Sequence, residues 1–160
     1  MKQILLLTTA MLTTFFLSAQ LKTTPICPAL YVDILDGRVN LLSPNSTAGE
    51  VKKALPCFSS SEDNGTCGST IFYKDRDLYF YPSRNYIEIR EKFKGKLSIP
   101  LMGANRNGLF KWLGLPKIKD VKWDAYQTQY GSLILDFNAA NRINKIQFST
   151  KSAESINLCQ

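Results

Sequence analysis

Short segments rich in β-branched and aromatic residues, separated by tight turns, dominate the chain from residue 70 onward. Segments of this composition, bounded by Asp, Asn, Pro and Gly, are typical of antiparallel strands. Because strand side chains alternate between two faces, the segments predict a sheet with one aliphatic face and one face of tyrosine and charge. The segments span residues 70–74, 78–81, 86–90, 121–130, 132–137 and 143–148.

A short helix is predicted before the first group of strands. Thr47 and Glu50 have the spacing of a capping box, in which each side chain bonds the other residue's backbone amide. Val51 and Leu55 then lie on one helical face, and Pro56 ends the helix. The polar residues 58–69 that follow are predicted to form a loop.

A second helix is predicted before the second group of strands, from an apolar stripe at helical spacing. Gly114 and Pro116 follow the stripe and are typical of a helix end. We expect Trp112 of the stripe, and Trp123 of the next strand, to lie in the core. The stripe consists of Leu109, Phe110, Trp112 and Leu113.

The order of helix, loop and three strands occurs twice, at an offset of about 55 to 60 residues. We therefore predict an α+β fold of two tandem α-βββ units, with the short helices packed on one face of an antiparallel sheet. Chance is the alternative explanation of the repeat. The units span residues 44–98 and 99–150; before them comes a segment, 20–43, with a β-hairpin around Asp36 and Gly37, and after them a tail, 151–160.

Residues 1–19 have the features of a secretory signal peptide: Lys2, an apolar run, and Ser18-Ala19 at a cleavage point. We expect an exported protein, in the periplasm or the medium, with no transmembrane segment in the mature chain. The formal charge is +7, of which Lys2 leaves with the signal. The basic residues are spread out, so a nucleic-acid partner is not expected.

Four cysteines in an exported chain predict two disulfides, for which three pairings are possible. In one of them a local Cys57–Cys67 bridge closes the polar loop, and Cys27–Cys159 joins the two ends of the mature chain. A zinc site is disfavoured because the chain has no histidine and the cysteine spacings do not fit one.

The residue types needed for common catalytic centres are missing or unremarkable. Without histidine, the Ser-His-Asp and Cys-His arrangements cannot form. Asp120 with Asp124, and Asp33 with Asp36, could be carboxylate pairs, but scattered acids are far more often surface residues. A Ser/Lys dyad stays open. We expect no enzyme, no cofactor and no metal.

Tyrosine and arginine make up the candidate binding residues. Both are enriched at protein interfaces, although tyrosine is also an ordinary strand residue. We expect most of the tyrosines to lie opposite the aliphatic positions of the sheet. The candidates are Tyr73, Tyr79, Tyr81, Arg84, Tyr86, Arg90, Tyr126 and Tyr130.

Three motifs resemble two groups of exported bacterial proteins, the β-lactamase inhibitory proteins and the small lipoproteins of the outer-membrane β-barrel assembly machine. They are the helix start at residues 46–51, the helix end at 113–116 and the strand at 133–137. Cys57 and Cys67 resemble the inhibitors' bridge after the helix. The lipid-bearing cysteine of the lipoproteins is missing, and the second half has no internal cysteine pair. The resemblance implies helices on one face of a continuous sheet, whose other face binds a protein.

Together these features predict an exported, non-catalytic domain that binds another exported or envelope protein, as an inhibitor, immunity factor or envelope accessory. The alternative is a module that binds a small ligand or glycan on the same aromatic face. A hydrolase with a Ser/Lys or carboxylate centre is the third possibility.

Overall fold

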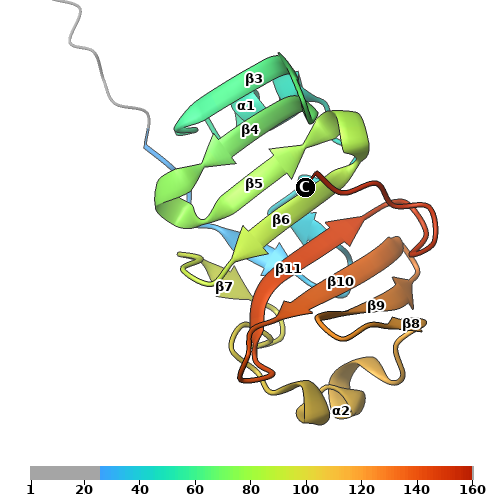
Figure 1. The fold of residues 1–160 in the computed structure, drawn as a ribbon. Coiled ribbons are helices and arrows are strands. Elements are labelled where there is room, and N and C mark those ends of the chain that lie inside the picture. The colour runs from blue at the N-terminus through green and yellow to red at the C-terminus, as the bar shows by residue number, and fades with distance from the viewer. Residues whose placement is uncertain (1–25, 160) are drawn as a thin grey trace, which may run out of the picture.

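The computed structural model describes residues 26–159, which form an α+β fold braced by two disulfides. Its main element is an eight-stranded sheet in which neighbouring strands are antiparallel (Figure 1). The predicted fold class is confirmed. The strands, in spatial order, are β3 (Ser60–Gly65), β4 (Gly68–Tyr73), β5 (Leu78–Tyr81), β6 (Tyr86–Arg90), β11 (Ile143–Ser149), β10 (Gly131–Phe137), β9 (Trp123–Thr128) and β8 (Ile118–Lys119).

Each half of the chain contributes four consecutive strands, and the last strands of the two halves, β6 and β11, pair at the centre of the sheet. The sequence predicted three strands per half. The added strands are β3 and β8. β3 lies in the segment 58–69 that the sequence predicted to be a loop, because its polar residues show no alternation of apolar and polar positions, and β8 has only two residues. The duplication of one ancestral unit stays a prediction.

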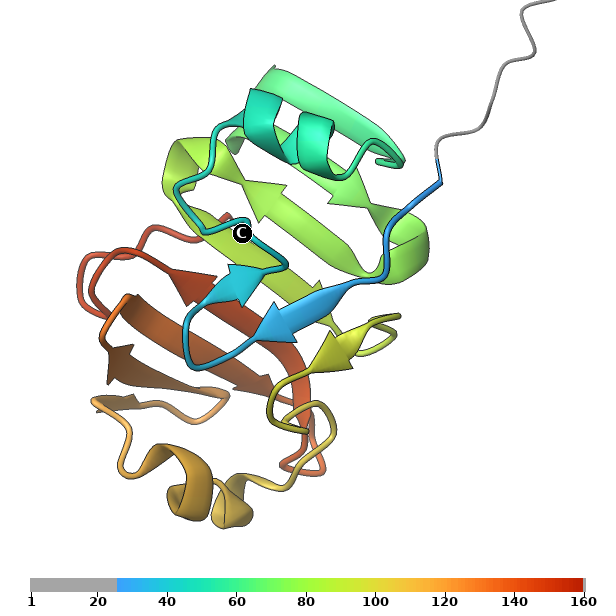
Figure 2. The same ribbon diagram turned by 180° about the vertical axis from the view of Figure 1, so that it is seen from behind.

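A second, three-stranded sheet contains the predicted N-terminal hairpin. Its strands are β1 (Tyr31–Asp33), β2 (Arg38–Val39) and β7 (Lys96–Leu97). Gly37 turns the hairpin with a φ of 63°. Val32 and Val39 pair across it, and both are fully buried. This small sheet and helix α1 (Ala48–Ala54) lie over the same face of the large sheet (Figure 2), which we call the core face.

The predicted capping box starts α1. The Glu50 amide donates to Thr47 Oγ1 at 3.3 Å, and the Thr47 amide donates to Glu50 Oε2 at 2.7 Å. Val51 and Leu55 are buried against the core face. The predicted aliphatic strand positions lie in the same core: Leu78, Phe80, Ile87, Ile89, Leu133, Leu135, Ile146 and Phe148.

Three short 3₁₀ helices form turns between these elements. η1 (Lys74–Arg76) joins β4 to β5, and η2 (Pro82–Arg84) joins β5 to β6. Asp77 and Asn85 end these helices with positive φ angles, which Asp and Asn adopt more readily than most residues. η3 (Arg106–Gly108) leads into the second α-helix.

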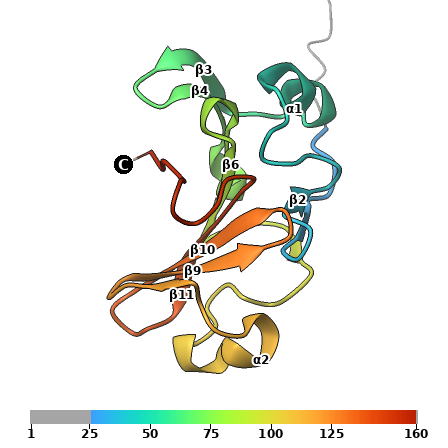
Figure 3. The same cartoon turned by 90° about the vertical axis from the view of Figure 1, so that its right-hand side faces the viewer.

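Helix α2 (Phe110–Leu113) is a single turn at the far end of the molecule from α1 (Figures 1 and 3). Leu109 is buried at its start and Leu113 packs against the core, but Phe110 and Trp112 are exposed. The prediction of a core Trp112 is therefore wrong, because one helical turn cannot bury a whole apolar stripe. Trp123 is half-buried, against a second, smaller cluster.

The disulfides connect Cys27 with Cys57 and Cys67 with Cys159. Of the three pairings that the sequence left open, the one with a local Cys57–Cys67 bridge and Cys27–Cys159 does not occur. β3 and β4 form a hairpin whose turn carries Cys67, while Cys57 lies before the hairpin and packs against the core. The two cysteines therefore meet different parts of the chain. The predicted signal peptide lies outside the described residues; within residues 26–159 no helix has the length and apolar character needed to cross a bilayer.

Candidate functional site

The second face of the large sheet is crossed at one end by residues 150–159 (Figures 1 and 3). We call it the tail face. Because side chains alternate along each strand, the residues between the core positions point to it. They include Thr70, Phe72, Tyr79, Tyr81, Tyr86, Glu88, Arg90, Trp123, Ala125, Gln127, Ser132, Ile134, Asp136, Lys145, Gln147 and Ser149.

Three of the eight candidate residues do not belong to the tail face. Tyr73 and Tyr126 lie in the core, and Tyr130 packs against it. The Tyr73 hydroxyl donates to the Leu55 carbonyl at 2.6 Å, and the Tyr130 hydroxyl donates to the Ile34 carbonyl at 3.1 Å. The expectation that these three tyrosines lie opposite the aliphatic positions is wrong. Tyr73 and Tyr130 can enter or approach the core because each hydroxyl reaches a backbone carbonyl.

Tyr79, Tyr81 and Tyr86 form an aromatic cluster on the tail face. Tyr81 and Tyr86 stack with ring centroids 4.3 Å apart, and Phe72 lies edge-on to Tyr79 at 5.7 Å. Tyr86 is fully buried and Tyr81 nearly so. The tail reaches Tyr86, whose hydroxyl accepts from the Cys159 amide at 3.0 Å. Burial raises the pKa of the Tyr81 hydroxyl, and nearby Glu88 adds to the rise. Only Tyr79 and Phe72 are open enough to meet a partner.

Arg84 joins the tail to the β3–β4 hairpin by hydrogen bonds to both. Its Nε and Nη2 donate to the carbonyls of Cys67 and Thr66, both at 3.2 Å. Its Nη1 donates to Asn157 Oδ1 at 3.0 Å and to the Leu158 carbonyl at 3.2 Å. The structure therefore gives this predicted binding residue a structural role beside the Cys67–Cys159 disulfide.

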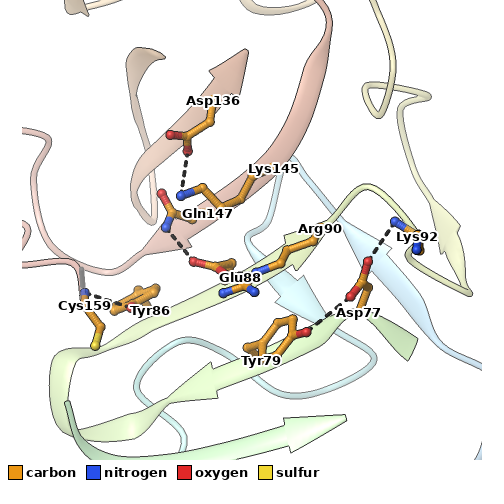
Figure 4. A network of polar contacts seen from close by, with 10 residues as sticks. All are labelled: Asp77, Tyr79, Tyr86, Glu88, Arg90, Lys92, Asp136, Lys145, Gln147 and Cys159. Atoms are coloured by element: carbon orange, nitrogen blue, oxygen red, sulfur yellow. Dashed lines mark hydrogen bonds and ion pairs between the residues drawn. The ribbon is translucent and has the colours of Figure 1, made fainter. Parts of the chain in front are cut away.

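Arg90 lies at the centre of a polar network (Figure 4). Its Nε donates to Glu88 Oε1, and its guanidinium lies over the Tyr79 ring, 4.3 Å from the centroid. Glu88 is only 2% exposed, whereas 47% of the Arg90 side chain is exposed. Burial opposes the charge of Arg90, but Glu88, together with Tyr79 and Tyr81, raises the pKa of the guanidinium above its usual value.

Beyond Glu88 the network continues into the second half of the chain. Gln147 Nε2 donates to Glu88 Oε2 at 2.7 Å, and Lys145 Nζ lies 3.5 Å from Asp136 Oδ2. Burial raises the pKa of the Asp136 carboxyl, and Lys145 opposes the rise. On the other side, Tyr79 donates its hydroxyl proton to Asp77.

Three neighbouring cavities open on the tail face. The first, of about 500 Å³, is lined by Phe72, Tyr79 and Tyr81 together with Glu62, Lys74 and Arg90. Arg90 also lines the second, of about 410 Å³, whose charged residues are Asp77, Arg90, Glu91, Lys92, Lys122, Asp136 and Lys145. The third, of about 420 Å³, lies between Asp136, Lys145 and the tail.

Three of the four carboxylates considered as catalytic pairs have structural partners instead. Asp124 pairs with Arg106, Asp120 Oδ1 accepts from the Lys122 amide, and Asp33 Oδ1 accepts from the Leu35 and Asp36 amides. In the described part of the chain, no group of three or more Cys, Asp or Glu side chains is arranged to hold a metal ion.

Sequence reasoning missed Phe72, Lys74, Gln147 and the tail as parts of this face. Alternation along residues 86–90 predicts Glu88 on this face, although Glu88 was not among the candidate binding residues. The same alternation could have found Phe72 and Gln147. No signal in the sequence indicates where the tail lies. Comparison of the chain with protein-family models, curated proteins and solved structures finds no match.

Proposed function

We propose that this chain is an exported, non-catalytic domain that binds another exported or envelope protein through the open part of the tail face. The open part consists of Phe72, Lys74, Tyr79 and Arg90. The two disulfides are compatible with an oxidising compartment, and an inhibitor, immunity or envelope accessory role fits such a domain. The proposal makes no use of a catalytic centre.

The observation that carries the proposal is the position of Arg90. Glu88 and Tyr79 fix its side chain, yet Nε is its only nitrogen that donates to a described residue. Nη1 and Nη2 therefore remain available to a ligand, on a half-exposed, pre-ordered side chain. A planar guanidinium with two open donors binds a carboxylate in bidentate geometry. The side chain would lose little entropy on binding, because it is already held in place.

The neighbours of Arg90 define the partner's chemistry. Phe72 and Tyr79 offer half-exposed aromatic surface, and Lys74 lies over Phe72, with Nζ 5.9 Å from the ring centroid. Tyr and Arg are the residue types that most often dominate protein interfaces. We therefore expect the partner to present an Asp or Glu side chain beside an apolar residue.

The test is affinity capture of the mature protein's partner from its own envelope fraction and medium. Arg90→Lys keeps the positive charge beside Glu88 but cannot bind a carboxylate in bidentate geometry. Tyr79→Ser removes the aromatic ring that packs against the Arg90 guanidinium. Each should weaken capture at least tenfold. Arg38→Lys and Tyr31→Ser, exposed residues of β1 and β2, are the matched controls and should capture normally.

Circular dichroism and thermal unfolding should show that all four variants keep the fold. Equal capture by Arg90→Lys, Tyr79→Ser and the controls would place the partner on another surface and reject the proposal.

A small ligand or glycan is the second candidate, favoured by the size of the aromatic cavity. Its volume of about 500 Å³ falls within the range of small-molecule sites. A thermal-shift screen of saccharides and carboxylate ligands separates the candidates. A stabilisation that Tyr79→Ser abolishes, with no captured protein, would replace the first proposal by the second.

A further inference from the structure

The end of the molecule that carries α2 exposes several large apolar side chains. We call residues 110–122 the α2 tip. Phe110 is 66% exposed, Leu115 82% and Val121 85%, and Trp112 is 36% exposed. Figure 3 shows α2 projecting beyond the strands, away from α1 and the crossing point of the tail. Four exposed apolar side chains within one short projecting segment, rather than single ones spread over the surface, indicate a contact surface.

The same segment is rich in lysine. The tip contains Lys111, Lys117, Lys119 and Lys122 against one acid, Asp120, which gives a net charge of +3. Lys111 Nζ lies 4.2 Å from the centroid of the Trp112 ring. Lys117 pairs with Glu154 at 3.6 Å. The other three lysines have no ion pair with any residue between 26 and 159.

The tip is held in shape by Arg106. This side chain pairs with Asp124, and its Nη atoms donate to the carbonyls of Val121 and Asp120 at 3.1 and 2.5 Å. Leu109, fully buried, anchors the start of α2. Gly114 ends α2 with a φ of 71°, a conformation that L side chains rarely adopt. These contacts fix the backbone that carries the apolar and basic side chains.

We infer that the α2 tip docks on an anionic lipid surface. Aromatic and aliphatic side chains enter the boundary between headgroups and acyl chains, where tryptophan is enriched. Lysines beside them stay at the anionic headgroups, each with its hydrocarbon stem along the apolar surface. A protein partner fits this composition less well, because lysine is depleted at protein interfaces.

The experiment measures sedimentation of the mature, oxidised protein with vesicles. One set contains phosphatidylglycerol and phosphatidylcholine in equal amounts, and the other phosphatidylcholine alone. Leu115→Ser with Val121→Ser removes apolar contacts, and Lys111→Gln with Lys119→Gln removes charge. The matched controls are Leu35→Ser with Leu41→Ser, at 60% and 90% exposure, and Lys53→Gln with Lys94→Gln, all outside the tip.

The wild-type protein should sediment with the anionic vesicles and return to the supernatant as salt is raised. With the phosphatidylcholine vesicles it should stay in the supernatant. Each lysine removed should weaken binding about fivefold at low salt, and each apolar side chain removed about tenfold. The controls should bind as the wild type does. Tyr79→Ser should also bind normally, so this test is independent of the tail-face proposal.

Three results would overturn the inference. They are no binding to the anionic vesicles, equal binding to both vesicle types, and equal loss in tip and control variants. A protein partner whose capture depends on the tip, without vesicle binding, would assign the tip to that partner instead.

Discussion

Gln147 donates a hydrogen bond from Nε2 to Glu88 Oε2 at 2.7 Å, between residues that face each other where β6 meets β11. Both side chains are almost fully buried, and they join the two halves of the chain. Removing one member leaves a buried polar group without its partner, which costs more than the bond itself contributes.

We therefore expect Gln147→Ala to lower the free energy of unfolding by about 2 to 3 kcal/mol. Glu88→Ala should lower the free energy of unfolding by less in the Gln147→Ala protein than in the wild type. We expect the two losses to differ by about 1 kcal/mol or more. Urea denaturation of the four proteins measures this coupling. Strictly additive losses would show that the two side chains act independently.

Arg84→Lys should destabilise the protein by about 2 kcal/mol, because lysine cannot reach the carbonyls of the hairpin and of the tail together. Amide hydrogen exchange should rise first in residues 157–159, while β4 and β5 stay protected. Arg38→Lys, on an exposed strand, is the control. Uniform exchange across the chain would contradict a local clamp.

Non-reducing peptide mapping should recover Cys27 linked to Cys57 and Cys67 linked to Cys159. The bridges close 92 residues for Cys67–Cys159 and 30 for Cys27–Cys57. Without a bridge the unfolded chain gains entropy, so the folded protein loses stability. Replacing both cysteines of the longer bridge by serine should lower the free energy of unfolding by about 4 to 5 kcal/mol, and replacing both cysteines of the shorter bridge should lower it by about 3 to 4 kcal/mol. A peptide that links Cys57 to Cys67 would contradict the fold of this hairpin.

Tyr126 should contribute to alkaline unfolding. Burial raises the pKa of its hydroxyl to about 12, and Asp124 adds to the rise. The unfolded chain loses this proton near pH 10 and the folded chain only near 12, so stability falls as pH rises through this window. No described residue accepts a hydrogen bond from the hydroxyl. Tyr126→Phe should therefore change stability by less than about 0.5 kcal/mol at pH 7.

The comparison of Tyr126→Phe with the wild type at pH 8 and pH 11.5 tests this contribution. Denaturant unfolding should show the variant to be the more stable protein at pH 11.5. Equal losses in both proteins would assign the alkaline sensitivity to other groups.

Gly131→Ala should destabilise the β9–β10 turn by about 3 kcal/mol. Gly131 has a φ of 141°, and a Cβ there would lie 2.2 Å from the Ser149 carbonyl oxygen. Thermal unfolding measures the loss. Gly49→Ala is the control, because nothing lies near its Cβ position and alanine favours the helix; it should be neutral or stabilising.

The sequence predicted those features that depend on neighbouring residues. The capping box of Thr47 and Glu50, the alternation of Leu78 with Tyr79, and the Asp36-Gly37 turn need only a few residues to be recognised. The disulfide partners, the path of the tail and the burial of Tyr73 depend on segments that are distant in the chain. Tyr73 shows this clearly, because its partner, the Leu55 carbonyl, lies 18 residues away.

The candidate site was predicted in part for the same reason. Alternation placed Tyr79 and Arg90 correctly on the second face of the sheet. It could not show that Tyr86 lies beneath the tail, or that the donors of Arg84 are used within the molecule. Whether a side chain on a sheet face is exposed depends on which other segments of the chain cross that face.

The ends of the strand order β3-β4-β5-β6-β11-β10-β9-β8 bear on self-association. An edge strand offers unpaired backbone groups to another chain and can start aggregation. Here one edge, β3, is the polar and acidic Ser60–Gly65 segment, with Glu62 and Asp63 exposed. The other, β8, has only two residues, one of them a lysine. Charge at one edge and shortness at the other protect a sheet rich in tyrosine and isoleucine from adding strands of a neighbouring molecule.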